Sequence, residues 1–265
     1  VEVSSGSDPG DPASTPAFNH LDTVLINEFM AQNQSVLLDE DGESSDWIEL
    51  WNPTDQPLSI SGWHLTDNPA DLTKWTFPAH VMAPNSFLVI FASTKDRATP
   101  GGEFHTSFAL EKSGGFLSLA RPGDQGGVQV VHQFNPYVAQ PENVSFGLHG
   151  DTPPLASGFF NTPTPNAANT SDALQGFVAD TRFSLDRGFF DTPQTVVITS
   201  ATPGASLIYT TDSTVPTASP LNGTLVNAPD AHTPPSVSVT ISTTTILRAY
   251  AFKDGHESTN VDTQT

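Results

Sequence analysis

Four carboxylates that could bind a cation lie close together in the segment LDEDGESSDW, residues 38–47. They are Asp39, Asp41, Glu43 and Asp46. Carboxylate oxygens are the hard ligands that calcium prefers, and Gly42 would allow the sharp turn that a calcium loop needs. The segment lacks the full ligand ladder and closing glutamate of a complete calcium loop. The sequence therefore predicts either a calcium site, with calcium as the one candidate cofactor, or a solvated acidic turn between two strands.

A second pair of carboxylates, Glu28 and Glu49, falls on two neighbouring predicted strands. Paired carboxylates can act as general acid and base when a cleft admits a substrate between them. A small sandwich of strands suggests no such cleft, so the alternative is that each side chain forms hydrogen bonds at a strand end or faces solvent. We predict no catalytic residues from this pair.

The four tryptophans lie close together in the sequence, at Trp47, Trp51, Trp63 and Trp75. Exposed aromatic rings could form a platform on which a sugar ring stacks, and Trp47 and Trp51 are the candidates because they alternate with the apolar Ile48 and Leu50. Large aromatic side chains are more often core residues. Trp63, in a Gly-Trp dipeptide, is predicted to be core.

Composition excludes several classes of function. The formal charge is −20 with nine Lys and Arg, so the surface would repel a polyanion and no nucleic-acid partner is expected. There is no cysteine, which excludes disulfides and thiolate metal sites. The histidines are scattered, and neither a nucleophile elbow nor a phosphate-binding loop is present. The longest apolar runs, such as residues 87–92, have the length of a strand, so no membrane insertion is predicted.

The elements that would position these residues are short strands. The 23 prolines and 19 glycines favour turns, and residues 104–110 and 128–134 alternate between apolar and polar positions. Such alternation is typical of half-buried antiparallel strands. The run FNTPTPNAANTSD, residues 160–172, predicts a domain boundary, and the Ser-, Gly-, Pro- and Asp-rich residues 1–20 predict an extended arm.

Beyond this boundary, four segments again have strand patterns. They are residues 195–200, 206–211, 236–242 and 246–252. In the third of these, SVSVTIS, Val237, Val239 and Ile241 are predicted to face inward and the hydroxyl side chains to face outward.

Several motifs of the first region resemble one known family. VLINEFMA (24–31), DWIEL (46–50), GWHLTD (62–67) and the closing TPTPNAAN (162–169) are similar to the lamin tail domain in its bacterial, secreted form. The resemblance implies a small immunoglobulin-like sandwich without catalytic machinery of its own.

The second region resembles a different family. IYTTDSTVPT (208–217) and TTTILRAYAFKDG (243–255) are similar to the C-terminal domain of chitobiases and related hexosaminidases. The usual motif reads YTTDGSEPT, so Ser213 stands in place of its glycine and Val215 in place of its acidic residue. In glycosidases this immunoglobulin-like module lies beside the catalytic barrel and carries out no chemistry.

Together these observations predict an all-β chain of two tandem immunoglobulin-like β-sandwich domains with an extended N-terminal arm. The arm spans residues 1–20, the lamin tail-like sandwich 21–170, a linker 171–176 and the chitobiase C-terminal-like sandwich 177–265.

We expect a protein that is not an enzyme and that acts outside the cell or on its surface, since the chain starts at Val1 without methionine, as a processed protein would. The leading hypothesis is a structural or adhesive protein that binds copies of itself or other cell-surface proteins. In its sharpest form, a strand-like arm segment pairs with a sheet edge of the next subunit and builds filaments. That segment is Val1, Glu2, Val3 and Ser4.

Two alternatives remain open from the sequence. One is a carbohydrate-binding accessory region of a larger secreted glycan-degrading enzyme, with polysaccharide as the partner. The other is a spacer module that calcium stabilises.

Overall fold

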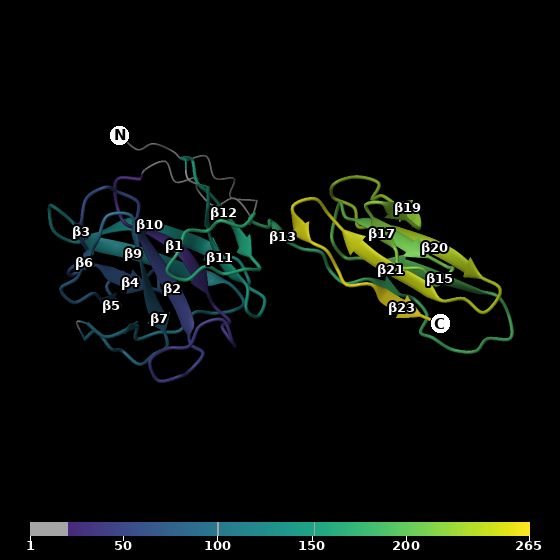
Figure 1. Ribbon diagram of the computed structural model, residues 1–265, viewed down its shortest axis with the longest axis horizontal. Coiled ribbons are helices and arrows are strands. Elements are labelled where there is room, and N and C mark those ends of the chain that lie inside the picture. Colours follow the sequence, from purple (N-terminus) through teal and green to yellow (C-terminus); the bar gives the residue numbers. More distant parts are fainter. Residues whose placement is uncertain (1–20, 100, 151) are drawn as a thin grey trace. The chain divides into compact units, whose positions relative to one another are not determined.

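The computed structural model describes residues 21–99, 101–150 and 152–265, and none of these residues forms a helix. No described element can therefore be a membrane-spanning helix. The chain divides into a first unit that ends at Ala173 and a second unit from Leu174 to Thr265, drawn in purple to teal and in green to yellow in Figure 1. The division falls inside the predicted linker, and the predicted arm, Val1 to Ser4 included, lies outside the described residues.

The first unit contains a six-stranded sheet in which every neighbouring pair is antiparallel except β7 and β8. In spatial order its strands are β12 (Ala156–Phe160), β11 (Ser145–His149), β1 (Leu25–Met30), β2 (Asp46–Asn52), β7 (Ser86–Ala92) and β8 (Phe104–His105).

A second, four-stranded antiparallel sheet and a two-stranded ribbon complete this unit. The four strands are β10 (Val128–Tyr137), β9 (Gly115–Pro122), β4 (His64–Thr66) and β5 (Trp75–Thr76), and the ribbon pairs β3 (Leu58–Ser59) with β6 (Val81–Met82). The two sheets pack their apolar faces together, because Phe29 of β1 contacts Phe134 and Tyr137 of β10 at centroid distances of 5.1 Å.

Two predicted strands differ from the structure in part. Only Phe104 and His105 of the 104–110 segment pair as a strand, although Phe104, Thr106, Phe108 and Leu110 are all buried as the alternation predicts. In β10, two register shifts break the alternation. His132 and Phe134 are therefore buried while Val128 and Val130, on the same predicted face, are exposed.

The second unit is a smaller sandwich of a three-stranded and a four-stranded sheet, shown in Figure 1. The first sheet has the order β14 (Arg182–Phe183), β15 (Gln194–Thr199) and β20 (Ser236–Ile241). The second has the order β19 (Thr224–Val226), β16 (Ser206–Thr210), β21 (Leu247–Phe252) and β23 (Asp262–Gln264). Two short ribbons pair β17 (Thr217–Ala218) with β18 (Leu221–Asn222) and β13 (Gly176–Phe177) with β22 (His256–Glu257).

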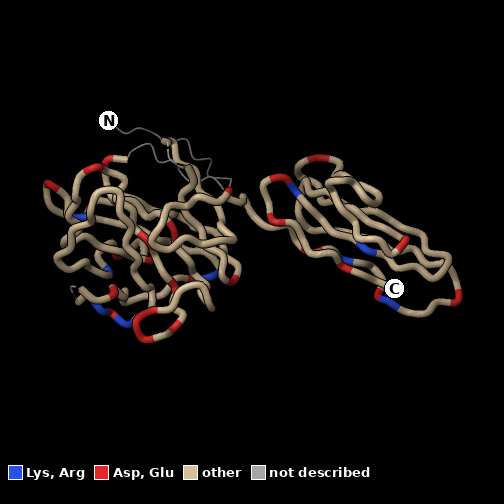
Figure 2. Tube along the Cα trace, viewed as in Figure 1, with Lys and Arg blue, Asp and Glu red and all other residues tan. Residues whose placement is uncertain are grey.

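The four strands predicted for the second unit are confirmed as β15, β16, β20 and β21. Its core is built from small and branched apolar residues, with Ile198, Leu207 and Ala249 among those fully buried. Acidic side chains outnumber basic ones in both units, and the excess is much larger in the first (Figure 2).

Candidate functional site

The acidic loop of residues 39–43 is organised around the Asp39 side chain, which is buried. Its Oδ1 accepts hydrogen bonds from the backbone N–H groups of Asp41 and Glu43, both at 3.0 Å, and Oδ2 accepts one from Ser45 Oγ at 3.2 Å. Gly42 has a φ of 78°, a conformation that glycine adopts without strain. The Asp39 carboxylate therefore stabilises the turn by accepting hydrogen bonds from it.

A lysine lies among the loop carboxylates. Lys95 Nζ is 2.6 Å from Asp39 Oδ2, 2.7 Å from Asp41 Oδ2 and 3.0 Å from Glu43 Oε2. Arg97 adds ion pairs with Asp41 at 2.7 Å and with Glu40 at 3.2 Å. Arg97 and Lys95 hold the pKa of Asp41 at about 2. Protein cations thus already balance the charge that a metal ion would balance.

The fourth predicted calcium ligand, Asp46, starts strand β2, and burial raises its pKa to about 6. Among the residues that the structure describes, no group of three or more acidic or histidine side chains is arranged to hold a metal ion. The four predicted calcium ligands are therefore not arranged as a metal site. The Lys95 ammonium group lies among three of them, where the sequence predicted calcium.

Glu28 and Glu49 are cross-strand partners on β1 and β2, and neither side chain has exposed surface. The prediction that they face solvent is wrong, because both are buried at the centre of the six-stranded sheet, whereas Glu28 does accept a hydrogen bond from Ser145 at the start of β11. They share the face that points away from the four-stranded sheet, since Ile26, Phe29 and Leu50 occupy the opposite face.

Residues 164–169, here named the strap, cover the two carboxylates. The backbone N–H and Oγ1 of Thr164 donate to Glu28 Oε2 at 3.1 and 3.2 Å, and the backbone N–H of Asn166 donates to Glu49. Asn169 Nδ2 donates to the backbone oxygen of Leu148 at 2.8 Å. The run predicted as a loosely packed boundary is in fact fastened to the sandwich by polar contacts.

Hydrogen bonds from the sheet complete the environment of the pair. Ser145 Oγ donates to Glu28, and Asn27 Nδ2 donates to Glu49 Oε1 at 2.8 Å. Burial, together with the neighbouring charge of Glu28, raises the pKa of Glu49 to about 8, and burial also raises the pKa of Glu28. No basic side chain of the described residues forms an ion pair with either glutamate. The arrangement fixes a chain segment in place and leaves no room for a substrate.

The predicted Trp47 and Trp51 platform is not formed. Trp47 is fully buried against Met30 and Phe91, beneath a loop that includes Leu37. Trp51 is half-buried and nearly parallel to the Phe87 ring, with an interplanar angle of 7° and a centroid distance of 6.1 Å.

The other two tryptophans also differ from each other. Trp75 is buried and meets Phe77 edge to face. Trp63, predicted to be core, is half-buried. Of the predicted platform, Trp51 alone keeps a ring accessible to solvent.

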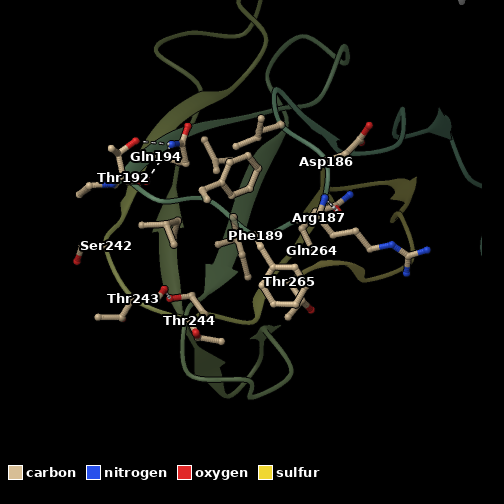
Figure 3. A pocket seen from close by; sticks show the side chains of 18 of the residues that line it. Asp186, Arg187, Phe189, Thr192, Gln194, Ser242, Thr243, Thr244, Gln264 and Thr265 are labelled. Carbon is tan, nitrogen blue, oxygen red and sulfur yellow. Dashed lines mark hydrogen bonds between the residues drawn. The ribbon is translucent and has the colours of Figure 1, made fainter.

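An apolar crevice that was not predicted opens at one end of the second sandwich (Figure 3). Its volume is about 760 Å³, and its walls include Leu185, Val196, Ile241 and Leu247. Phe189, on the loop between β14 and β15, borders it and is fully exposed. Its neighbour Phe190 has 48% of its surface exposed.

The crevice has a mainly apolar lining and a polar rim. Figure 3 shows Arg187 directed away from the crevice and hydroxyl side chains such as Thr243 and Thr244 on its rim. Burying a large exposed apolar side chain against a partner is favourable, because it removes apolar surface from water. The sequence did carry a signal, because RGFFDTP places two consecutive aromatic residues, Phe189 and Phe190, in a turn-rich stretch.

Comparison with known families supports the two resemblances. Residues 20–134 match the model of the Lamin Tail Domain, and residues 185–263 match the Chitobiase/beta-hexosaminidase C-terminal domain. No curated protein matches the chain. The first match ends within β10, whereas β11, β12 and the strap continue the same sandwich beyond it.

Both families are immunoglobulin-like and of non-catalytic types, associated with protein–protein contacts or with carbohydrate-active proteins. The chain is therefore all-β, and it consists of a lamin tail domain followed by a chitobiase/β-hexosaminidase C-terminal domain.

Proposed function

We propose that this chain is a non-catalytic structural or adhesive protein that acts outside the cell or on its surface through contacts with other protein chains, copies of itself included. The observation that carries the proposal is the pair Phe189 and Phe190 beside the apolar crevice. Exposed aromatic side chains next to a pocket are typical of the residues that contribute most binding energy at protein interfaces.

The chemistry of the crevice favours a protein partner. Aliphatic walls from Leu185, Val196, Ile241 and Leu247 suit an apolar side chain better than a sugar, whose hydroxyl groups would lose their hydrogen bonds to water. The Phe189 ring can pack on the partner from the rim. A partner chain would thus bury both the ring and the crevice.

The proposal is tested with the double variant F189S/F190S and a matched control, Val215→Ser, which removes an exposed apolar side chain that does not line the crevice. Light scattering over a range of concentrations, with electron microscopy of the same samples, gives the mass of each species. We expect the wild type to exceed the 28.2 kDa of one chain and the double variant to return toward it. A wild type that stays at one chain mass at every concentration contradicts self-association.

The predicted arm adds a second contact to this proposal. Val1, Glu2, Val3 and Ser4 lie outside the described residues, and the hypothesis that they pair with a sheet edge of the next subunit rests on their alternating pattern. A head-to-tail contact of this kind does not close and would give filaments. Deletion of residues 1–18 should then abolish polymers seen by electron microscopy, whereas unchanged polymers would exclude the arm.

A carbohydrate-binding role is the second candidate, and Trp51 with Phe87 is the observation that favours it. Two nearly parallel, partly accessible rings on one sheet face can stack against the C–H face of a sugar. Titration with soluble polysaccharides should then shift the tryptophan fluorescence of the wild type and leave that of Trp51→Ala unchanged. Absence of a shift in the wild type would exclude this role.

A further inference from the structure

Strand β20 leaves one edge of the three-stranded sheet of the second unit unpaired. Its six residues pair with β15 without a register shift, and β15 is its only strand neighbour among the described residues. The strand carries no charge, no proline and no glycine, and Ser236, Ser238 and Thr240 are exposed. A regular, uncharged edge of this kind is a template for pairing with another strand.

The other edges of the described sandwiches are less available. β10 has two register shifts and contains Pro136, both of which discourage edge pairing. The last three residues of β12, Gly158 to Phe160, are buried. The remaining edge strands, β5, β8, β14, β19 and β23, have two or three residues each. β20 is thus the edge on which a second strand fits best.

We infer that two copies of this chain pair through β20, antiparallel and about a two-fold axis that passes through Val239. This inference rests on the proposed self-association and adds a second contact surface to that of Phe189 and Phe190. Residues directly opposite each other in an antiparallel pair point to the same side of the sheet. Pairing centred on Val239 places Val237 opposite Ile241 and Ser238 opposite Thr240, so apolar meets apolar and hydroxyl meets hydroxyl.

Burial favours this register, and the absence of charge on β20 favours the pairing itself. Val237 and Ile241 are only partly buried against the core, and a second β20 would cover them. Centring on Ser238 instead would place Ile241 opposite Pro235, which precedes the strand and has no backbone N–H to donate. Because the strand is uncharged, two copies of a chain with a formal charge of −20 can approach there without placing like charges opposite each other.

A disulfide test follows from the absence of cysteine in the chain. In S238C/T240C, each cysteine lies opposite one on the partner copy, at a Cα separation that a disulfide can span. Mild oxidation should convert this variant to a covalent dimer of twice the chain mass. The control S242C/T244C places the same spacing in the exposed loop after the strand and should stay monomeric. Absence of the covalent dimer at concentrations where the wild type associates would overturn the inference.

Charge substitutions test the register itself. S238K/T240K places lysine opposite lysine in the dimer and should raise its dissociation constant by about tenfold or more. S238K/T240E places lysine opposite glutamate and should restore association. Circular dichroism confirms that each variant is folded.

The outcomes separate this inference from the proposed function. If the wild type associates and neither lysine variant differs from it, the β20 pairing is wrong and self-association through another surface stands. If the wild type does not associate at any concentration, both fail.

Discussion

The two sandwiches of this chain differ in how far their sheet faces and edges are covered. In the first, the outer face of the six-stranded sheet is covered by a loop over Trp47 and by the strap over Glu28 and Glu49. In the second, an apolar crevice stays open at one end, and no strand of the described residues pairs with the free edge of β20. The first unit thus covers this sheet face with its own chain, whereas the second leaves apolar and backbone groups that another chain can cover.

The difference also concerns polar groups. The first unit buries three carboxylates with hydrogen-bonded partners, those of Glu28, Asp39 and Glu49, while the buried polar side chains of the second unit are uncharged hydroxyls. Buried polar networks specify one arrangement, because a wrong arrangement leaves buried groups without partners. We therefore expect the first unit to act as a rigid scaffold and the second to make the contacts.

The largest expected effect is on the first unit. Trp47→Ala should lower its free energy of unfolding by about 4 kcal/mol, because a fully buried indole is removed. All four tryptophans lie in the first unit, so tryptophan fluorescence in urea reports on that unit alone. Trp51→Ala, which removes a half-buried ring, is the control and should cost less. Equal effects would mean that Trp47 is not a core residue.

The next effect concerns the strap. Glu49→Ala should lower the unfolding free energy by about 3 kcal/mol, since the N–H of Asn166 loses its acceptor and the buried amide of Asn27 loses one as well. The exposed Glu142→Ala should change it by less than about 0.5 kcal/mol. Urea titration measures both. An Asn166 amide that exchanges with solvent equally fast in wild type and Glu49→Ala would show that the anchor does not hold the strap.

The two units should also differ in their response to alkali. The pKa of Glu49 is raised from 4.5 to about 8, so between these values the folded chain holds a proton that the unfolded chain has released. The first unit should therefore lose about 2 kcal/mol of stability between about pH 6.5 and pH 8.

The window starts at about pH 6.5 because of His132, whose pKa burial lowers from 6.5 to about 3. Between these two values His132 makes the stability of the first unit rise with pH, which opposes the effect of Glu49. In the second unit, the lowered pKa values of Asp212 and Asp230 act at acidic pH and the raised pKa of Tyr250 acts at strongly alkaline pH, so both lie outside this window. Thermal unfolding across this window, with Glu49→Gln as the control that should flatten the slope, tests the difference. A slope that persists in the variant would contradict it.

A smaller effect is expected from the acidic loop. Lys95→Met should cost the first unit about 1.5 kcal/mol, because Asp39, Asp41 and Glu43 lose their shared counter-ion in a partly buried site. Calcium should then raise the melting temperature of Lys95→Met and leave that of the wild type unchanged. A clear rise for the wild type would restore the calcium-stabilised spacer as a hypothesis.

The smallest expected effect concerns the second unit, and it is a stabilisation where the preceding substitutions destabilise. Ser213 has a φ of 69°, a left-handed conformation that costs a serine free energy and a glycine almost none. Ser213→Gly should therefore stabilise the second unit by about 0.7 kcal/mol or less. Calorimetry should show its melting transition move upward while that of the first unit stays in place. A downward shift would indicate that the Asp212 hydrogen bonds to Thr214 depend on the serine.

Alternation and turn residues predicted the all-β fold and the main strands of the second unit, because they are local signals, and the resemblance of short motifs predicted the two families. Neither kind of signal could predict what covers a sheet face. The pairing of Glu28 with Glu49 was visible, but the strap that buries both comes from more than a hundred residues further along the chain.

The predictions for the acidic loop and for Trp47 missed contacts for the same reason, since these contacts come from other segments of the chain. Lys95 lies more than fifty residues from the loop that it neutralises, and Trp47 is buried by a loop rather than by the facing sheet. Ser213 was recognised as a departure from its family motif, and the structure keeps the turn by placing the serine in the conformation usual for glycine.

The strap also determines how mechanical tension enters the first sandwich. A pull from the second unit along the chain reaches residues 164–169 before it reaches the edge strand β12. The strap passes that force to Glu28 and Glu49, which belong to the interior strands β1 and β2. Tension along the chain must then break the hydrogen bonds of the strap before it can separate β12 from the sheet.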